Sequence, residues 1–187
     1  MKKIGIFGGT FDPVHLGHTS AAQAAAEQFG LDLVIFVPTS KPPHKPGNYE
    51  DGGVHRYNMV QIACADNGLF AVSDFEIRHG GTSYTYITAE YFREKYRDDE
   101  LYFILGDEAY NQIDAWKNPE RVRAALDFIV VTRCDTQPPR DALFLNIAPI
   151  PISSTEVRRR IAVGEDASQM LNGGVYEYIL KHNLYKG

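Results

Sequence analysis

The sequence is poor in the features that mark disulfide-rich, zinc-binding or membrane proteins. Its 187 residues include two cysteines, Cys64 and Cys134, and neither lies in a CxxC pair. Such a chain supports neither a disulfide framework nor a zinc site, and isolated thiols are typical of a reducing compartment. The apolar stretch 4–7 is too short for a secretory signal, and no apolar run approaches the ~20 residues of a membrane-spanning helix. We therefore expect a cytoplasmic protein with no membrane partner.

The sequence also lacks a large excess of charge of either sign. The formal net charge is −5, with 23% charged and 44% hydrophobic residues, which is close to the average of globular proteins. Nucleic-acid-binding domains usually carry a strong basic excess, so no nucleic-acid partner is expected, although a local basic patch could still bind a small phosphate ligand. The chain is long enough to bury a sizeable core, and its length fits a single domain spanning residues 1–187.

Apolar runs alternate with helical patterns along the whole chain. Short runs that stop at glycine, such as 3–7 before Gly8 and Gly9, predict buried strands. The Ala-rich segment 19–29, followed by Gly30, predicts a helix. The same criteria predict strands at 3–7, 33–37, 69–75, 101–105, 128–132 and 143–147, and helices at 19–29, 54–65, 85–96, 108–115, 119–125, 154–163 and 175–182.

This alternation predicts an α/β fold, a Rossmann-like, doubly wound parallel sheet that binds ligands at the C-terminal ends of its strands. The helices in 153–187 form a small C-terminal helical subdomain in this prediction. Residues 38–53 form a long loop, and such loops are often functional or mobile. The apolar positions expected to face the core are Val54, Met59, Ile62 and Ala63 in the helix 54–65, and Ile87, Tyr91 and Phe92 in the helix 85–96.

The segment that follows the first strand reads GGTFDPVHLGH from Gly8 to His18. Its spacing matches neither GxGxxG nor a Walker A loop. Glycines there allow the backbone to approach a ligand, and His15 and His18 share one face at the start of a helix. Two imidazoles at a helix N-terminus favour a polyphosphate site. The alternatives are a metal pair, for which only Asp12 offers a third ligand nearby, and two surface histidines beside a structural turn.

A second polar segment, ISSTEVR at 152–158, opens a predicted helix near the other end of the chain. Ser153 or Ser154 can cap that helix, and its N-terminus can bind an anion. Arg158, one turn further, would point its guanidinium toward a phosphate at that end. The alternative is an ordinary capped helix whose arginines, Arg158 to Arg160, form a solvated basic face.

Taken together, the two segments resemble the HxGH nucleotidylyltransferase superfamily and, within it, the bacterial nicotinate-mononucleotide adenylyltransferases. The resemblance covers nearly the whole chain. Further matches are PPHK at 42–45, Arg56 and Met59, SYT at 83–85, FILG at 103–106, and Trp116.

The resemblance implies transfer of the adenylyl group of ATP to nicotinate mononucleotide, giving deamido-NAD and pyrophosphate by direct attack without a covalent intermediate. Mg²⁺ would enter with ATP, and the protein would supply no metal ligand of its own. The implied catalytic residues are His15, His18 and Arg158. The implied ATP-binding residues are Gly8, Gly9, Thr10, Phe11, His15, His18, Gly106, Ile152, Ser153, Ser154 and Arg158.

The implied acceptor site consists of Lys45, Tyr84, Thr85 and Trp116. Trp116 would stack on the pyridine ring, and the backbone amide of Thr85 would meet the carboxylate of nicotinate. Lys45 would reach in from the loop 38–53, which would act as a partial lid. A lone tryptophan is more usually a core anchor, and Tyr84 could equally pack under the loop.

Two positions depart from the pattern of the family on the expected acceptor side. Ile87 stands where the family's SYTxDT has its aspartate, and Glu108 stands where its GxD has one, with Asp107 a position earlier. The alternatives are therefore an adenylyltransferase for nicotinamide mononucleotide or phosphopantetheine, a catalytically silent nucleotide-binding protein, and a metallohydrolase built on His15 and His18.

Overall fold

The computed structural model describes residues 1–42, 53–132, 141–148 and 150–186. Its centre is a sheet of six parallel strands in the order β3-β2-β1-β4-β5-β6. The chain winds outward from β1 in one direction and then from β4 in the other, so the predicted doubly wound α/β fold is confirmed. The strands are β1 Lys3–Gly9, β2 Leu33–Pro38, β3 Phe70–Val72, β4 Glu100–Gly106, β5 Asp127–Thr132 and β6 Leu143–Asn146.

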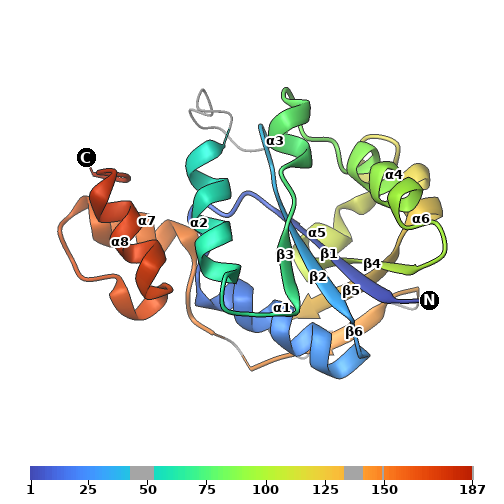
Figure 1. Ribbon diagram of the computed structural model, residues 1–187, viewed down its shortest axis with the longest axis horizontal. Coiled ribbons are helices and arrows are strands. Elements are labelled where there is room, and N and C mark those ends of the chain that lie inside the picture. The colour runs from blue at the N-terminus through green and yellow to red at the C-terminus, as the bar shows by residue number, and fades with distance from the viewer. Residues whose placement is uncertain (43–52, 133–140, 149, 187) are drawn as a thin grey trace.

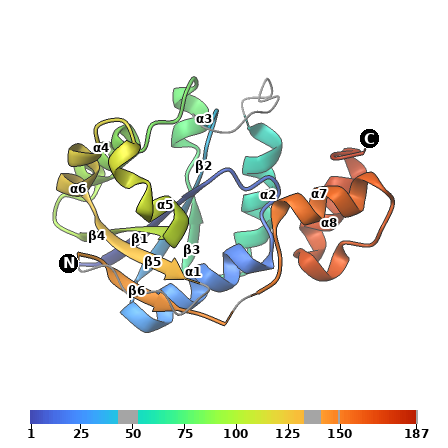
Figure 2. The same ribbon diagram turned by 180° about the vertical axis from the view of Figure 1, so that it is seen from behind.

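Helices cover both faces of the sheet (Figures 1 and 2). One face packs against α1 and α2, and the other packs against α4, α5 and α6, whereas α7 and α8 extend the core of the first face beyond α2. The helices are α1 Leu16–Phe29, α2 Val54–Cys64, α3 Phe75–His79, α4 Thr85–Lys95, α5 Asp107–Asn111, α6 Pro119–Ala125, α7 Ser154–Ala162 and α8 Gly173–Lys181, with short 3-10 turns η1 Ile113–Ala115 and η2 Ser168–Met170.

The central strands explain why their sequences are continuously apolar. In β2, Val34 and Phe36 enter the core on one face, whereas Ile35 and Val37 enter the core on the other. Because side chains alternate between faces and both faces are covered, every position needs an apolar residue. The continuous apolar run LVIFV in β2 thus indicates that both faces of the sheet are buried at this strand.

The predicted elements differ most from the structure in three places. The run 69–75 is a strand only over β3, because Ser73 and Asp74 cap a helix instead, with the Ser73 Oγ accepting from the Phe75 amide at 3.2 Å. The predicted helix 108–115 is split into α5 and η1. Helix α1 begins at Leu16, three residues earlier than predicted, and ends as expected before Gly30 in the left-handed conformation (φ 64°).

Of the predicted core positions on α2 and α4, Met59 and Phe92 are confirmed, Ile62, Ala63 and Tyr91 pack against the cores partly buried, and Val54 and Ile87 were wrong. In α2 the buried residues are Arg56, Met59, Val60 and Cys64, whereas Val54 in its first turn is 49% exposed. In α4 the buried residues are Thr88, Ala89 and Phe92, and Ile87 and Tyr91 are half-buried. Both buried sets follow the i, i+3, i+4 spacing of one helical face.

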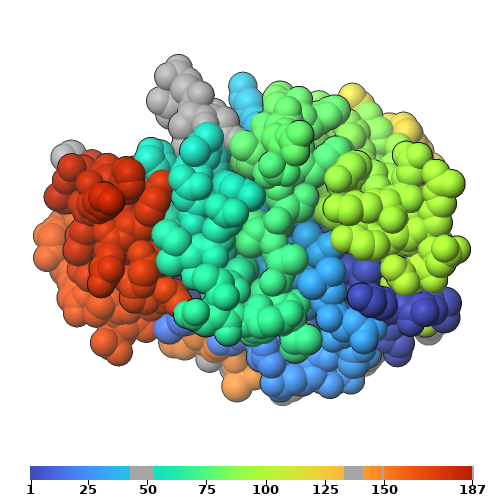
Figure 3. Space-filling view, viewed as in Figure 1, coloured from blue at the N-terminus to red at the C-terminus, as the bar shows by residue number. Residues whose placement is uncertain are grey.

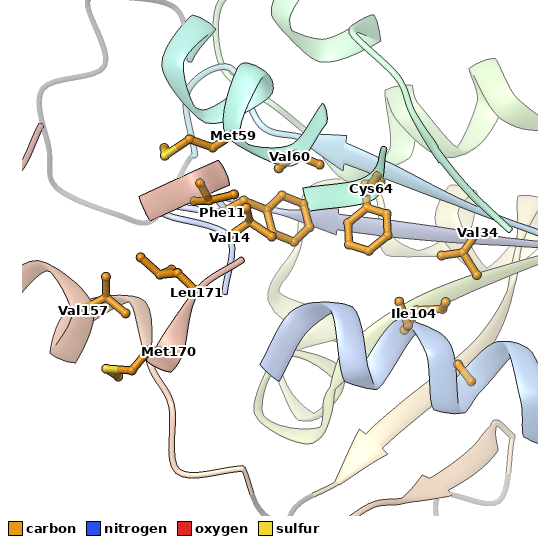
Figure 4. Close-up of a cluster of buried hydrophobic side chains, with 14 of the residues drawn as sticks. Phe11, Val14, Val34, Met59, Val60, Cys64, Ile104, Val157, Met170 and Leu171 are labelled. Carbon is orange, nitrogen blue, oxygen red and sulfur yellow. The ribbon is translucent and has the colours of Figure 1, made fainter. Parts of the chain in front are cut away.

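The C-terminal helices lie at one end of the molecule, where α8 is beside α2 (Figures 1 and 3). Phe11 and Val14, from the segment after β1, lie in the core between α2 and the C-terminal helices (Figure 4). The division of the chain into one domain with a C-terminal helical part, 153–187, stays a prediction. No helix in the described part of the chain is both long and apolar enough to cross a bilayer.

Candidate active site

The segment after β1 makes a tight turn around a buried aromatic ring. Phe11 adopts a left-handed backbone conformation (φ 49°), and its side chain is buried in the core with its ring edge-on to His18, the centroids 5.1 Å apart. A Cβ at Gly9 would come within 2.8 Å of the Phe11 ring. The second glycine of GGTF is therefore required by the close approach of Phe11. Any contact of Phe11 with a ligand must come from its backbone.

The two histidines of the HLGH segment lie against each other at the start of α1. Their rings stack with centroids 3.7 Å apart, and the His15 amide donates to Nδ1 of His18 at 3.2 Å. Because Nδ1 accepts, the hydrogen of neutral His18 sits on Nε2, which can donate to an anion. A Cβ at Gly17 would lie 3.0 Å from the His15 ring. The glycine between the histidines thus leaves the space that the stacked pair needs.

The structure joins the two polar segments directly. The Ser153 Oγ caps α7 by accepting from the Glu156 amide at 3.1 Å, as the sequence predicts. The Ser154 hydroxyl donates to the carbonyl of Pro13 at 2.9 Å, and Arg158 Nη1 donates to the carbonyl of Asp12 at 2.6 Å. The start of α7 is therefore bonded to the residues that precede the stacked histidines.

Ile152 and the other two arginines of this segment have separate places. The carbonyl of Ile152 lies 3.9 Å from the position that a Cβ of Gly17 would take, beside the histidine pair. Arg159 and Arg160 form ion pairs with Glu156, and Arg159 also pairs with Glu165. The solvated basic face was thus predicted correctly for these two arginines, whereas Arg158 turns toward the segment after β1.

A cavity of about 240 Å³ opens at the carboxyl ends of β1 and β4, where the winding of the sheet reverses. This is the position at which doubly wound sheets bind ligands. The cavity is adjacent to the histidine cluster, because the turn after β1 belongs to both. The predicted site residues that line it are Gly8, Gly9, Thr10, Tyr84, Thr85 and Trp116.

The aromatic residues Trp116 and Tyr84 line this cavity and are partly exposed. Trp116 is half-buried, with its ring edge-on to Phe103 at 6.3 Å between centroids, so it is not a fully buried core anchor. The Lys117 ammonium lies 4.3 Å from the centre of the Tyr84 ring. Gly106 caps α5 at the end of β4 and is exposed, and Lys45 lies outside the described residues.

Arg56 is a buried cation to which sequence reasoning assigned no role. Its side chain is only 4% exposed, and its guanidinium donates to the carbonyl of Thr10 at 2.7 Å and to the carbonyl of Ser40 at 2.8 Å. These carbonyls belong to the turns after β1 and β2. The arginine therefore ties the two turns together beside the cavity, and its match to the family pattern was the signal that the sequence offered.

Glu76 is a second residue that the sequence did not reveal. It lines the cavity from α3 and is 8% exposed, and the Thr88 hydroxyl donates to its Oε1 at 2.5 Å. Its Oε2 is buried without a hydrogen-bond partner in the described part of the chain. Burial raises the pKa of this carboxyl above its ordinary value, and the hydrogen bonds and nearby cations only partly offset that effect.

The two positions that depart from the family pattern have different surroundings. Ile87 lines a small cavity of about 10 Å³ that it shares with Glu76 and Thr88. Glu108 is exposed, and its amide donates to Oδ1 of Asp107 at 2.8 Å. Ile87 therefore lines the same small cavity as Glu76, whereas the Glu108 side chain faces solvent.

The remaining histidines and cysteine have structural surroundings. Nδ1 of His55 lies 2.9 Å from the hydroxyl of Tyr178, and the His55 and His182 rings are 5.2 Å apart. Among the described residues, no group of three or more His, Cys, Asp or Glu side chains is arranged to hold a metal ion. Cys64 is a buried free thiol with its pKa raised by burial to about 12, and Cys134 lies outside the described residues.

Comparisons with known proteins identify the family of this chain. Residues 6–160 match the family model described as Cytidylyltransferase-like. The chain is 36% identical over 200 residues to the probable nicotinate-nucleotide adenylyltransferase of Clostridium tetani, covering 100% of both chains, and 40% identical to that of Desulfitobacterium hafniense strain Y51, covering 99% and 96%. The chain belongs to the nicotinate-nucleotide adenylyltransferase family.

Solved structures of this family share the fold. A Plasmodium falciparum nicotinic acid mononucleotide adenylyltransferase complexed with NaAD superposes with a TM-score of 0.82 at 22% identity, covering 99% of this chain and 98% of that one. A putative nicotinate-nucleotide adenylyltransferase from Vibrio parahaemolyticus gives a TM-score of 0.73 at 24% identity, covering 100% and 96%. The family membership that the HxGH and ISSTEVR segments predicted is confirmed.

Proposed function

We propose that this protein transfers the adenylyl group of ATP to nicotinate mononucleotide. An oxygen of the mononucleotide phosphate forms a bond to the α-phosphorus of ATP, and the bond from that phosphorus to the α–β bridging oxygen breaks. The products are deamido-NAD and pyrophosphate. The observation that carries the proposal is the direct bonding of Ser154 and Arg158 to the residues before His15, which assembles the family's two motifs beside one cavity.

The phosphate-binding side consists of donors rather than nucleophiles. His18 donates from Nε2 to an oxygen that gains charge as the bridging bond breaks, and the stacked His15 keeps its ring in place. Arg158 and Ser154 hold the β- and γ-phosphates. Catalysis of this kind depends on positioning and on stabilising charge in the transition state, because no covalent intermediate is formed.

The nucleotide and its metal are bound mainly by backbone and phosphate groups. Backbone groups of the glycine turn, together with Gly106 and Ile152, approach the adenosine, while the cap of α7 at Ser153 presents its amides to the triphosphate. Mg²⁺ enters as part of the substrate, since it prefers phosphate oxygens and retains several waters. It neutralises charge on the departing pyrophosphate.

The acceptor occupies the cavity between β1 and β4. Trp116 stacks on the pyridine ring, and the amide of Thr85 at the N-terminus of α4 donates to the nicotinate carboxylate. Tyr84 and Lys45 complete this side in the proposal, although Lys45 lies outside the described residues. We place the reaction in the cytoplasm, where ATP is abundant.

The test is an assay of the purified protein with ATP, Mg²⁺ and either nicotinate or nicotinamide mononucleotide. We expect equal amounts of pyrophosphate and deamido-NAD, with nicotinate mononucleotide preferred. A preference for the nicotinamide form would contradict the assignment of the acceptor. ATP hydrolysis without dinucleotide formation would contradict adenylyl transfer, as would a complete lack of turnover, the result expected of a silent nucleotide-binding protein.

His18→Ala tests the catalytic assignment within this reaction. Loss of one donor to the developing charge lowers kcat by about 100-fold or more, and the melting temperature stays close to that of the wild type because His18 is only half-buried. His182→Ala, which removes an exposed histidine at the end of α8, is the matched control. An unchanged kcat in His18→Ala would exclude His18 from the reaction.

A further inference from the structure

The last described residues of the chain return to the segment after β1. Beyond α8 the chain reverses direction, with the Leu184 amide donating to the carbonyl of Ile179 at 3.1 Å. Tyr185 then adopts a left-handed conformation (φ 63°), and its hydroxyl donates to Oδ1 of Asp12 at 2.7 Å. A bulky residue in that conformation is uncommon and persists where surrounding contacts hold it. The strained backbone thus delivers one hydroxyl to one carboxylate.

Asp12 is also the residue that Arg158 contacts. Arg158 Nη1 donates to the backbone carbonyl of Asp12 at 2.6 Å, whereas the same nitrogen is 3.9 Å from Oδ2 of the carboxylate. A guanidinium beside a carboxylate ordinarily forms two short parallel hydrogen bonds. Here one oxygen of the carboxylate is bonded to the Tyr185 hydroxyl, and the other forms only a long ion pair with Arg158, which donates to the main chain and, at 3.4 Å, to the Thr155 hydroxyl.

The hydroxyl of Tyr185 remains a donor at any working pH. Burial and the adjacent Asp12 carboxylate raise the pKa of this phenol well above its ordinary value. The Arg158 side chain, by contrast, is 37% exposed and is accessible to a ligand. The Tyr185–Asp12 bond is partly buried, with the Asp12 side chain 30% exposed, so both contacts lie at the edge of the fold, where a ligand can reach the arginine.

We propose that Tyr185 is a positioning residue that holds the Asp12 carboxylate away from Arg158 and so leaves the guanidinium open to the phosphates of ATP. Without the hydroxyl, the carboxylate turns to Arg158 and closes a bidentate ion pair with it. ATP must then break that pair in order to bind. This inference rests on the proposed role of Arg158 in binding the triphosphate.

Tyr185→Phe tests the proposal because it removes the hydroxyl and keeps the ring. We expect KM for ATP to rise about tenfold, the scale of one charge-assisted contact, while KM for nicotinate mononucleotide stays within about twofold. The matched control is Tyr178→Phe. Its hydroxyl contacts His55 and Asn58 instead of Asp12, so KM for ATP should not change. An equal rise in both variants would overturn the proposal.

The double variant Asp12→Asn/Tyr185→Phe separates positioning from a merely structural role. A neutral amide does not compete for Arg158, so KM for ATP should return to within about twofold of the wild-type value despite the missing hydroxyl. Failure of Asp12→Asn to rescue the Tyr185→Phe variant would overturn the proposal, since it would show that the carboxylate is not what restrains the arginine.

Arg158→Ala distinguishes failure of this inference from failure of the proposed function. If Arg158→Ala impairs ATP use and Tyr185→Phe does not, the inference about Tyr185 is overturned and the role of Arg158 stands. If Arg158→Ala has no effect on ATP use, the proposed role of Arg158 is overturned and the inference with it. An impaired Arg158→Ala, together with an impaired and rescued Tyr185→Phe, supports both.

Discussion

At the scale of single residues, the site depends on places where a side chain is missing. A Cβ at Gly9 would press on the ring of Phe11, and a Cβ at Gly17 would press on the ring of His15. The HxGH pattern therefore has a steric reason. The glycine is needed for the stacking of two imidazoles and not for an unusual backbone conformation, because Gly17 is an ordinary residue of α1.

Gly17→Ala should separate stability from activity. A Cβ there lies 3.0 Å from the His15 ring, so the ring must shift by a few tenths of an ångström within the stack, and kcat should fall by about tenfold or more. Alanine favours helix over glycine by about 1 kcal/mol. This gain offsets part of the strain that the Cβ introduces, so the free energy of unfolding should change little. Gly173→Ala at the start of α8, where a Cβ meets open space, is the matched control and should keep full activity. Equal kcat in the two variants would contradict the steric account.

Glu76 gives the folded state a pH dependence with a definite sign. Its pKa is raised in the folded protein by burial, so the folded state binds the proton more tightly than the unfolded state. The free energy of unfolding should therefore fall as pH rises from the ordinary carboxyl pKa through the raised one. Glu76→Gln should flatten this part of the profile and be more stable than the wild type at neutral pH, as measured by urea unfolding across pH.

A contrasting carboxylate provides the control for that measurement. The pKa of Glu156 is lowered to about 2 by Arg159 and Arg160, so its contribution is present above the ordinary carboxyl pKa and is lost as pH falls toward 2. Glu156→Gln should lower the free energy of unfolding above the ordinary carboxyl pKa and should change the slope of the profile only on its acid side. If Glu76→Gln also changed the slope of the profile only on its acid side, the assignment of a raised pKa to Glu76 would be wrong.

At the scale of elements, the site depends on how the turns after neighbouring strands are tied together. Arg56 on α2 bonds to the turn after β1 and to the turn after β2, and α7 bonds to the segment before α1. Each tie crosses from one element to another through a main-chain carbonyl. The carbonyl positions, rather than side-chain pairs, therefore fix the shape of the site.

Arg56→Ala should destabilise the protein by about 2–4 kcal/mol, because it leaves the carbonyls of Thr10 and Ser40 buried without their charged donor. Arg56→Lys should lose less, since one ammonium can still reach one carbonyl. The control is Arg78→Ala, whose exposed pair with Asp74 should contribute about 1 kcal/mol or less. Urea unfolding measures the stability of all three variants. Similar losses of stability in Arg56→Ala and Arg78→Ala would contradict the role of Arg56 in joining the two turns.

Elements with a strong repeating pattern were predictable from the sequence, and those defined by capping were not. The runs in β2 and β4 and the Ala-rich α1 signal their type through composition alone. Helix α3 escaped prediction because it is only five residues long and directly follows a strand, and only Ser73 and Asp74 indicate its start. The split between α5 and η1 has no comparable pattern in the sequence.

At the scale of the whole molecule, distant parts of the chain converge on one turn. Asp12 and Pro13 receive contacts from Ser154, Arg158 and Tyr185, more than 140 positions away in sequence. Motif recognition predicted the partnership of the first two segments. It did not predict Arg56, Glu76 or Tyr185, because these residues act through contacts across the fold that no local spacing encodes.

The central claim is that the HxGH segment and the start of α7 form a single triphosphate site. The most direct measurement is a crystal structure of the protein with Mg²⁺ and a non-hydrolysable ATP analogue. We predict phosphate oxygens within hydrogen-bond distance of both His18 Nε2 and the Arg158 guanidinium, with the Arg158 contact made while Tyr185 remains bonded to Asp12. A triphosphate bound away from either residue would contradict the account.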